Sequence, residues 1–293
     1  MAELAGQEVV EVAFTAADGH LNRFESMEGK WSETFKDKHW HINDKVLVRP
    51  QYEHLYFKDY LALLHRGGTA AERNSYLHQT ELHLHLPQLL NFTADPPYML
   101  PEIFHKETNL WMSAGGTVTS LHVDTSENIM HMVSGQKEFL LFRPNQKRYL
   151  HYESVPEIRY DDTGNGPVQP RTAAQPACPA LAAAAPSANP ALCFGKSAQS
   201  ARINDIHGLV DPTNVDWARY PNYKNAHGLR CHVRQGDALY VPSHWHHAVY
   251  SPPGSASSSC RNVGVNFWYI ATKNKQEAAA AHPMSWTADK PEL

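Results

Sequence analysis

A histidine separated from an acidic residue by one position occurs three times in this sequence, as His105 with Glu107, His122 with Asp124, and His151 with Glu153. The spacing alone has little specificity. The second pair differs from the others because it lies in a segment whose composition predicts a strand, where residues two apart project from one face. These two side chains can therefore reach one metal ion together. The other two pairs lie near turn signals and are interpreted as solvated surface residues.

Two histidines and one carboxylate form the ligand set of non-haem iron(II) oxygenases, which leave positions open for a cosubstrate and oxygen. The missing histidine has three candidates at the end of a late predicted strand: His244, His246 and His247. Their spacing alone does not choose among them. Two other histidine pairs, His39 with His41 and His83 with His85, have no third ligand at a fixed spacing and are interpreted as structural or surface residues.

Four motifs occur in the order and rough spacing of JmjC hydroxylases, a family that includes the asparaginyl hydroxylase inhibiting hypoxia-inducible factor. They are Leu121-His122-Val123-Asp124, Val133-Ser134-Gly135-Gln136-Lys137, Gly236-Asp237-Ala238-Leu239-Tyr240-Val241-Pro242 with Trp245-His246-His247, and Val265-Asn266-Phe267-Trp268-Tyr269. The chain most closely resembles the small JmjC (3S)-lysyl hydroxylases. In that family the distal ligand stands five positions after the proline, which gives His247. Strand periodicity agrees, because residues 245 and 247 then share one side. His246 stands where the family has an aromatic residue.

A 2-oxoglutarate cosubstrate needs a buried cation or hydroxyl for the carboxylate far from the metal. Lys137, on the strand after Asp124, is the natural cation, although an arbitrary hairpin lysine would be solvated. The resemblance assigns it to that carboxylate. It also implies hydroxyl donors at Thr119 and Tyr76, and amides lining the cosubstrate or iron at Asn128 and Asn266, each with a plain structural alternative. Trp111 matches an aromatic residue of the relatives. It is expected either to pack in the core or to contact a ligand.

The resemblance implies an iron(II)- and 2-oxoglutarate-dependent protein hydroxylase that consumes oxygen and hydroxylates a lysine, with a GTP-binding protein as partner. A JmjC demethylase of methylated lysine or arginine and a tRNA hydroxylase are alternatives with the same chemistry. A non-catalytic metal-binding cupin interaction module is a third, but it predicts loss of a ligand or of Lys137. Relatives also imply a homodimer through C-terminal helices, for which Gln276–Ala281 is the candidate.

The elements that must position these residues are mostly short strands punctuated by Gly, Pro and Asp. They predict a mainly β fold, a double-stranded β-helix of the jelly-roll or cupin type with surrounding helices. Helices are expected at Tyr52–Leu64 and Leu86–Phe92. Strands are expected at Glu8–Phe14, Ser75–Leu77, Thr117–Asp124, Ile129–Val133, Lys137–Phe142, Leu229–Val233, Ala238–Val241 and Asn262–Ile270. Residues 1–109 are expected to pack on a barrel of residues 110–271, followed by a tail at 272–293. An Ala/Pro-rich insertion at 171–201 interrupts the barrel and carries no chemistry.

Composition narrows the function classes further. The 293 residues carry a net charge of −4, which disfavours nucleic acid as a partner. The start lacks the features of a secretory signal, no apolar run is long enough to cross a bilayer, and the four cysteines lack paired spacing. These features predict a cytoplasmic protein without membrane contact, with the nucleus as a second compartment. No phosphate loop, nucleophile elbow or H-E-x-x-H motif is present.

Overall fold

A computed structural model describes residues 1–15, 18–26, 44–66, 74–93, 103–158, 202–204, 206–253 and 261–271 of the chain. These residues form two compact units. One is built from residues 1–22, 52–153 and 205–293, and the other from residues 23–51 and 154–204. The first unit contains every residue singled out as a candidate ligand or cosubstrate contact. Each unit is described by itself.

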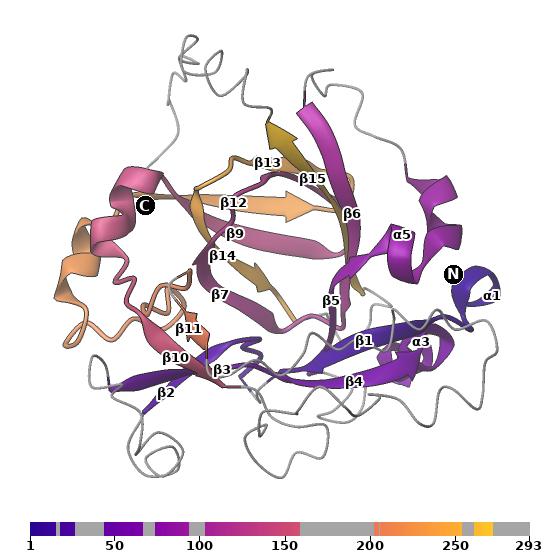
Figure 1. Ribbon diagram of the computed structural model, residues 1–293, viewed down its shortest axis with the longest axis horizontal. Coiled ribbons are helices and arrows are strands. Elements are labelled where there is room, and N and C mark those ends of the chain that lie inside the picture. Colours follow the sequence, from indigo (N-terminus) through magenta and orange to yellow (C-terminus); the bar gives the residue numbers. More distant parts are fainter. Residues whose placement is uncertain are drawn as a thin grey trace. The chain divides into compact units, whose positions relative to one another are not determined.

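The larger unit contains a seven-stranded sheet with the order β13-β8-β15-β6-β5-β1-β4 (Figure 1). Its strands are β1 (Val9–Phe14), β4 (Gln51–Tyr56), β5 (Ser75–Glu81), β6 (Ile103–Ser113), β8 (Glu127–Ser134), β13 (Ala238–Val241) and β15 (Asn262–Ala271). From β13 to β1 every neighbouring pair is antiparallel. Strands rich in Val, Ile, Phe and Thr suit such a sheet because branched and aromatic side chains pack well on a pleated surface.

A four-stranded sheet of the same unit has the order β12-β9-β14-β7. Its strands are β7 (Thr117–Val123), β9 (Gln136–Phe142), β12 (Gly228–Arg234) and β14 (His246–Ser251), and all neighbours are antiparallel. Gly135 has a φ of 76° in the tight turn between β8 and β9, a conformation that glycine adopts without strain. The hairpin therefore joins the two sheets.

Alternation along the strands separates an inner layer of side chains from an outer one. Inner residues from both sheets pack together, namely Met130 and Met132 of β8 with Phe139 and Leu141 of β9. The outer face of the seven-stranded sheet is covered by α3 (Phe57–Arg66), α5 (Leu82–His85) and α1 (Ala2–Ala5), which contribute Phe57, Tyr60, Leu82 and Ala5 to a second apolar cluster. Two antiparallel sheets enclosing a shared interior form a double-stranded β-helix, the predicted fold class.

Short 3-10 helices complete the described part of the larger unit: η2 (Pro87–Phe92), η3 (Pro144–Tyr149) and η5 (Pro221–Asn225). Each begins with proline, which is tolerated in a first turn because its missing N–H would have no helical partner there. The smaller unit is a four-stranded sheet, β11 (Arg202–Asn204), β10 (Val155–Ile158), β3 (Lys45–Val48) and β2 (Arg23–Ser26), in that order. Its central pair, β10 with β3, is parallel.

Most predicted elements are present, with two corrections. The helix expected at Tyr52–Leu64 begins only at Phe57, because residues 51–56 form β4 instead. His105 and Glu107 lie in β6 rather than near a turn, and the register shifts between their partners Tyr269 and Trp268. The insertion at 171–201, the tail at 272–293 and the predicted dimerisation segment lie outside the described residues. The boundaries at 109 and 271 stay a prediction. No helix among the described residues is long and apolar enough to span a membrane.

Candidate metal centre

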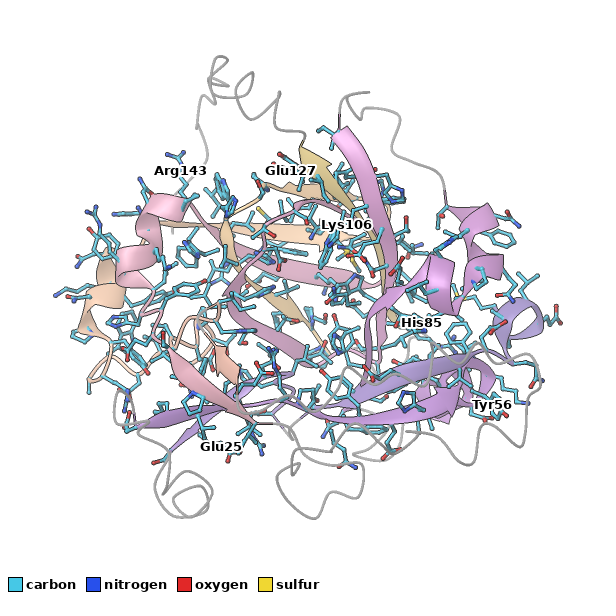
Figure 2. The ribbon with its side chains drawn as sticks, viewed as in Figure 1. Glu25, Tyr56, His85, Lys106, Glu127 and Arg143 are labelled. Carbon is cyan, nitrogen blue, oxygen red and sulfur yellow. The ribbon has the colours of Figure 1, made fainter. Side chains whose placement is uncertain are left out.

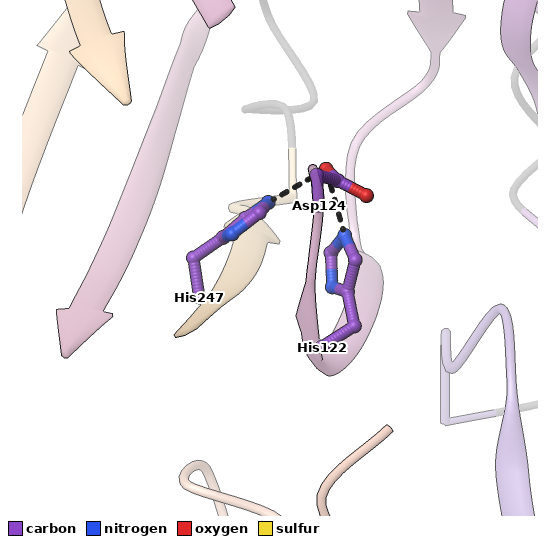
Figure 3. A group of neighbouring side chains, drawn as sticks. All are labelled: His122, Asp124 and His247. Carbon is purple, nitrogen blue, oxygen red and sulfur yellow. Dashed lines mark ion pairs between the residues drawn. The ribbon is translucent and has the colours of Figure 1, made fainter. Parts of the chain in front are cut away.

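His122, Asp124 and His247 converge at one end of the four-stranded sheet (Figure 3). His122 of β7 and His247 of β14 are direct register partners, and Asp124 follows β7 immediately. One ligand atom from each residue lies within 4.8 Å of the others. The Nε2 atoms of His122 and His247 are 3.6 Å and 3.4 Å from the same Asp124 oxygen, Oδ2. Two strands thus bring together side chains that are far apart in the sequence.

Backbone carbonyls orient both imidazole rings. The Nδ1 atom of His122 lies 2.8 Å from the carbonyl oxygen of Ser120, and that of His247 lies 3.1 Å from the carbonyl oxygen of Trp245. A carbonyl only accepts, so each Nδ1 carries a proton, and Nε2 is the nitrogen of each ring that remains to bind a metal ion. This is the usual arrangement of metal-binding histidines, whose second nitrogen is fixed by a hydrogen bond.

The protonation states of the cluster suit a cation. Burial lowers the pKa of His247, which favours the neutral ligand form. Burial alone would raise the pKa of Asp124, but the adjacent imidazoles of His122 and His247 hold it well below its usual range. Two imidazole nitrogens and one carboxylate oxygen, directed at a common point, fit iron(II) with coordination positions to spare.

The three histidines left open by spacing lie in different environments. His247 is 3% exposed and belongs to the cluster, whereas His246 projects from the opposite face of β14. There its Nδ1 lies 2.9 Å from the Tyr152 hydroxyl and its Nε2 lies 3.4 Å from the carbonyl oxygen of Pro144. His244 is exposed, with a φ of 64° in the turn before β14. Only His247 is therefore placed to share an ion with His122 and Asp124.

Glu127 fixes the turn that leads to His247. Its carboxylate accepts hydrogen bonds from the Ser243 backbone N–H at 3.0 Å, the Ser243 hydroxyl at 2.8 Å and the Tyr240 hydroxyl at 2.5 Å. In the same turn the His244 N–H donates to the Asp124 carbonyl oxygen at 2.7 Å. Sequence reasoning missed Glu127, because its partners are more than 100 positions away and no motif marks it.

Lys137 is 2% exposed and lies at the opposite end of β9 from the level of the histidines. Its ammonium donates to Ser251 Oγ at 2.9 Å and to the Tyr76 hydroxyl at 3.3 Å. Burial lowers the pKa of Lys137 to about 7, and among the described residues no carboxylate pairs with it. Burial raises the pKa of Tyr76, an effect that a hydrogen bond with Thr119 opposes. A buried cation ringed by hydroxyls is suited to bind a carboxylate.

The structure brings the predicted hydroxyls of Thr119 and Tyr76 together with Lys137, and it adds Ser251, which sequence reasoning missed. Ser251 lies on the same strand as His247. The available signal was weak, since a serine in a strand has many structural roles. Asn128 and Asn266 do not contact Lys137. They lie on β8 and β15 of the facing sheet, where they form a separate polar group with Trp111.

Trp111 donates a hydrogen bond to Asn266, which in turn donates one to Asn128. The indole Nε1 of Trp111 lies 2.8 Å from Asn266 Oδ1, and Asn266 Nδ2 lies 2.9 Å from Asn128 Oδ1. Because an indole N–H can only donate, Asn266 must accept through oxygen and donate through nitrogen. Asn128 then accepts through its oxygen, and its NH₂ group remains as a donor. Trp111 therefore packs in the inner cluster, one of the two functions weighed for it, and it also orients two amides; its contact with a ligand stays a prediction.

A cupin-like domain family model matches residues 2–275 of the chain. The chain therefore belongs to this family, and its JmjC character is shown by its relatives. It is 28% identical over 196 residues to a human protein described as bifunctional peptidase and (3S)-lysyl hydroxylase JMJD7, covering 62% of this chain and 51% of that protein. It is 29% identical over 164 residues to lysine-specific demethylase JMJ32 of Arabidopsis thaliana, covering 55% and 41%.

A third relative, JmjC domain-containing protein E of Dictyostelium discoideum, is 26% identical over 172 residues, covering 55% of this chain and 42% of that protein. The chain thus spans about half the length of the curated relatives it matches. The first two relatives are described by different activities, and both descriptions concern lysine. The comparisons establish the JmjC cupin family, whose iron and 2-oxoglutarate chemistry the residues described above fit.

Proposed function

We propose that this protein is an iron(II)- and 2-oxoglutarate-dependent protein hydroxylase that acts on a lysine side chain. The observation that carries the proposal is the pairing of two sites in one barrel. His122, Asp124 and His247 form a metal-ligand set at one end, and the buried ammonium of Lys137 lies deeper in the same sheet. A dicarboxylate that chelates a metal with one end needs a cation of this kind for the other.

The residues divide the work of binding and orientation. His122, Asp124 and His247 would hold iron(II), while Lys137 and Ser251 would bind the remote carboxylate of 2-oxoglutarate. With both bound, the site would supply oxidation of a C–H bond by dioxygen: one oxygen atom would enter the substrate as hydroxyl, and the other would enter succinate as 2-oxoglutarate loses carbon dioxide. The apolar inner cluster, to which both sheets contribute, would keep bulk water away from the reacting groups.

The lysine assignment is supported by the relatives and not by the metal site. The human relative is described as a (3S)-lysyl hydroxylase and the Arabidopsis relative as a lysine-specific demethylase. We further propose a GTP-binding protein as the substrate and a homodimer, both on the basis of the resemblance. We also propose a cytoplasmic location that extends to the nucleus, on the basis of the sequence features given above.

Anaerobic addition of iron(II) and then 2-oxoglutarate tests the core of the proposal. The wild-type chain should develop the weak visible absorption of a metal-bound keto acid, and His122→Ala and Asp124→Ala should not. His227→Ala is a matched control, because this histidine is exposed and its described contact is made by its backbone N–H. Absence of the band in folded wild-type protein would refute the oxygenase assignment.

Product analysis separates hydroxylation from demethylation. A lysine-containing protein substrate should gain one oxygen atom, with one succinate formed for each hydroxylation. Release of formaldehyde from a methylated lysine or arginine peptide, without a stable oxygen addition, would instead assign the chain to the demethylases. The iron and 2-oxoglutarate sites would stand in either case.

A further inference from the structure

Acidic and amide side chains line the inner face of the seven-stranded sheet across from the metal-ligand set. Leu110 and Met112 of β6 pack in the outer cluster, and Trp111 packs in the inner one. Because side chains alternate along a strand, Asn109 lies on the inner face with Trp111. Glu81 of β5 is the register partner of Asn109, and Glu107 stands two positions earlier in β6. We call Glu81, Glu107, Asn109 and Trp268 the acidic wall.

The register places the acidic wall at the metal end of the barrel. Glu107 pairs with Trp268 of β15, which pairs in turn with Asn128 near the start of β8. The preceding residue, Glu127, holds the turn that leads to His247. Figure 2 shows Glu127 and Lys106, the neighbour of Glu107, on the same side of the barrel. The wall therefore faces the space beside the metal and not the Lys137 pocket.

Two buried groups of the acidic wall lack hydrogen-bond partners. Asn109 is 1% exposed, and neither its Oδ1 nor its Nδ2 has a partner. The Trp268 indole N–H is likewise buried and unpartnered. Unsatisfied polar groups are costly in a protein interior, and native structures retain few of them. A polar ligand that enters the barrel would satisfy both.

The chain's own Lys106 shows what Glu107 and Trp268 can bind. Its ammonium lies 3.2 Å from Glu107 Oε1 and 5.0 Å from the centroid of the Trp268 ring. A carboxylate and an aromatic face together favour an ammonium ion. The Lys106 side chain is 41% exposed, whereas that of Glu107 is 15% exposed, so the lysine can withdraw into water while the carboxylate stays in the wall.

The two glutamates of the wall lie close enough to repel each other. The pKa of Glu81 is raised, first by burial and then by the negative charge of Glu107. Lys106 offsets this repulsion in part. A second ammonium between the carboxylates would relieve it further, because opposite charge stabilises the ionised form of both acids.

We propose that the acidic wall is the subsite for the ammonium group of the substrate lysine. The proposal deepens the proposed function and rests on it for the identity of the reaction. Charge then determines where each ligand binds. The 2-oxoglutarate dicarboxylate is attracted by Lys137 and repelled by Glu81 and Glu107. The substrate lysine is attracted by the acidic wall. Asn109 and the Trp268 N–H complete the subsite with hydrogen bonds.

Calorimetric titration with two small probes tests the subsite. Nα-acetyl-lysine methylamide carries the ammonium, and Nα-acetyl-norleucine methylamide has the same chain length without it. The full chain is titrated anaerobically with manganese(II) and 2-oxoglutarate present, and again without them, so that amine binding is measured apart from any reaction. Wild-type protein should prefer the lysine probe by about tenfold, as expected of a charge-assisted contact.

Glu107→Gln and Glu81→Gln should each remove most of that preference, whereas Glu53→Gln, an exposed residue of β4, should not change it. Lys106→Met should strengthen lysine-probe binding about threefold, because it removes the internal competitor. A merely structural role for Glu107 would not produce this gain. Equal binding of the two probes to wild type, or an unchanged preference in both glutamine variants, would overturn the subsite. A protein that binds neither manganese(II) nor 2-oxoglutarate but still discriminates between the two probes would uphold the subsite and refute only the oxygenase assignment.

Discussion

His122 and His247 stand directly opposite each other across β7 and β14, with their ring centroids 4.1 Å apart. Residues 125 positions apart in the chain are thereby held in one geometry by the sheet hydrogen bonds, and not by a flexible loop. Asp124 joins them from the end of β7, so two of the three side chains are placed by regular strand structure.

The face on which a histidine lies on β14 should decide whether it affects metal binding. His247→Ala should weaken iron(II) or manganese(II) binding by at least about 100-fold, since it removes a ligand. His246→Phe should change the affinity by no more than about threefold, because His246 contacts Tyr152 on the other face. Isothermal titration with manganese(II) measures both. The opposite result would assign the ligand role to His246.

Stability should depend on pH through Lys137. Burial lowers the pKa of this ammonium from 10.5 in the unfolded chain to about 7 in the folded one. Between those pH values the unfolded state binds more protons, so the free energy of unfolding should rise as pH increases from about 7 to 10. Lys137→Met should remove this rise and should be more stable than wild type near pH 6 by roughly 2–4 kcal/mol. Urea unfolding of the ligand-free protein measures both effects.

The same titration should appear in cosubstrate binding with the opposite sign. The charged ammonium binds the carboxylate, so the dissociation constant of 2-oxoglutarate should increase above pH 7, by up to about tenfold per pH unit. Lys137→Met should bind about 100-fold more weakly at pH 6.5 and lose this dependence. A wild-type affinity that stays constant from pH 6.5 to 9 would place the carboxylate elsewhere.

Glu127 should act on the metal site through the turn at Ser243. Glu127→Ala removes the acceptor of three hydrogen bonds and should weaken manganese(II) binding about tenfold. Tyr240→Phe removes only one of the three and should have less than half that effect in free energy. Comparable metal affinities for wild type and Glu127→Ala, in proteins of equal thermal stability, would show that the turn needs no such anchor.

Trp111 should orient Asn128 through Asn266. Trp111→Phe keeps an aromatic ring but removes the N–H donor that makes Asn266 accept through oxygen, so the amides of Asn266 and Asn128 can reverse. The dissociation constant of 2-oxoglutarate should increase about three- to tenfold, as expected for one oriented hydrogen bond, while manganese(II) affinity stays unchanged. Equal loss of both affinities would indicate general damage to the barrel.

The sequence predicted the strands better than the helices, for a physical reason. Short runs of branched and aromatic residues between turns identify β7, β9 and β13 within a residue or two at each end. The helix predicted from Tyr52 to Leu64 was wrong in its first part, because apolar spacing that fits a helix also fits a strand that leads into one. Pairing in the sheet, which depends on distant residues, decided the outcome there.

The residues of the candidate site also fall into two groups, those that local patterns predicted and those that they did not. Local strand periodicity was enough to put His122 with Asp124, whereas His247 was chosen over His246 by the family resemblance, with which strand alternation agreed. Ser251 and Glu127 could not be found in this manner, because their importance lies in contacts with Lys137 and Ser243 that no local pattern encodes. Glu107 was misassigned for the same reason, since turn signals around it concealed a bulged strand.

His246 and His247 are neighbours on opposite faces of β14, and this affects how the protein would tolerate an inserted residue. Adding one residue to the turn at Ser243 would slide β14 by one step, which would put His246 in the position of His247 and move His247 to the outer face. An imidazole would still face Asp124 after the insertion. In a chain with only one histidine at this end of β14, the same insertion would remove a metal ligand. The cost would then fall on the exterior contact with Tyr152 and on the meeting of Ser251 with Lys137 at the far end of the strand.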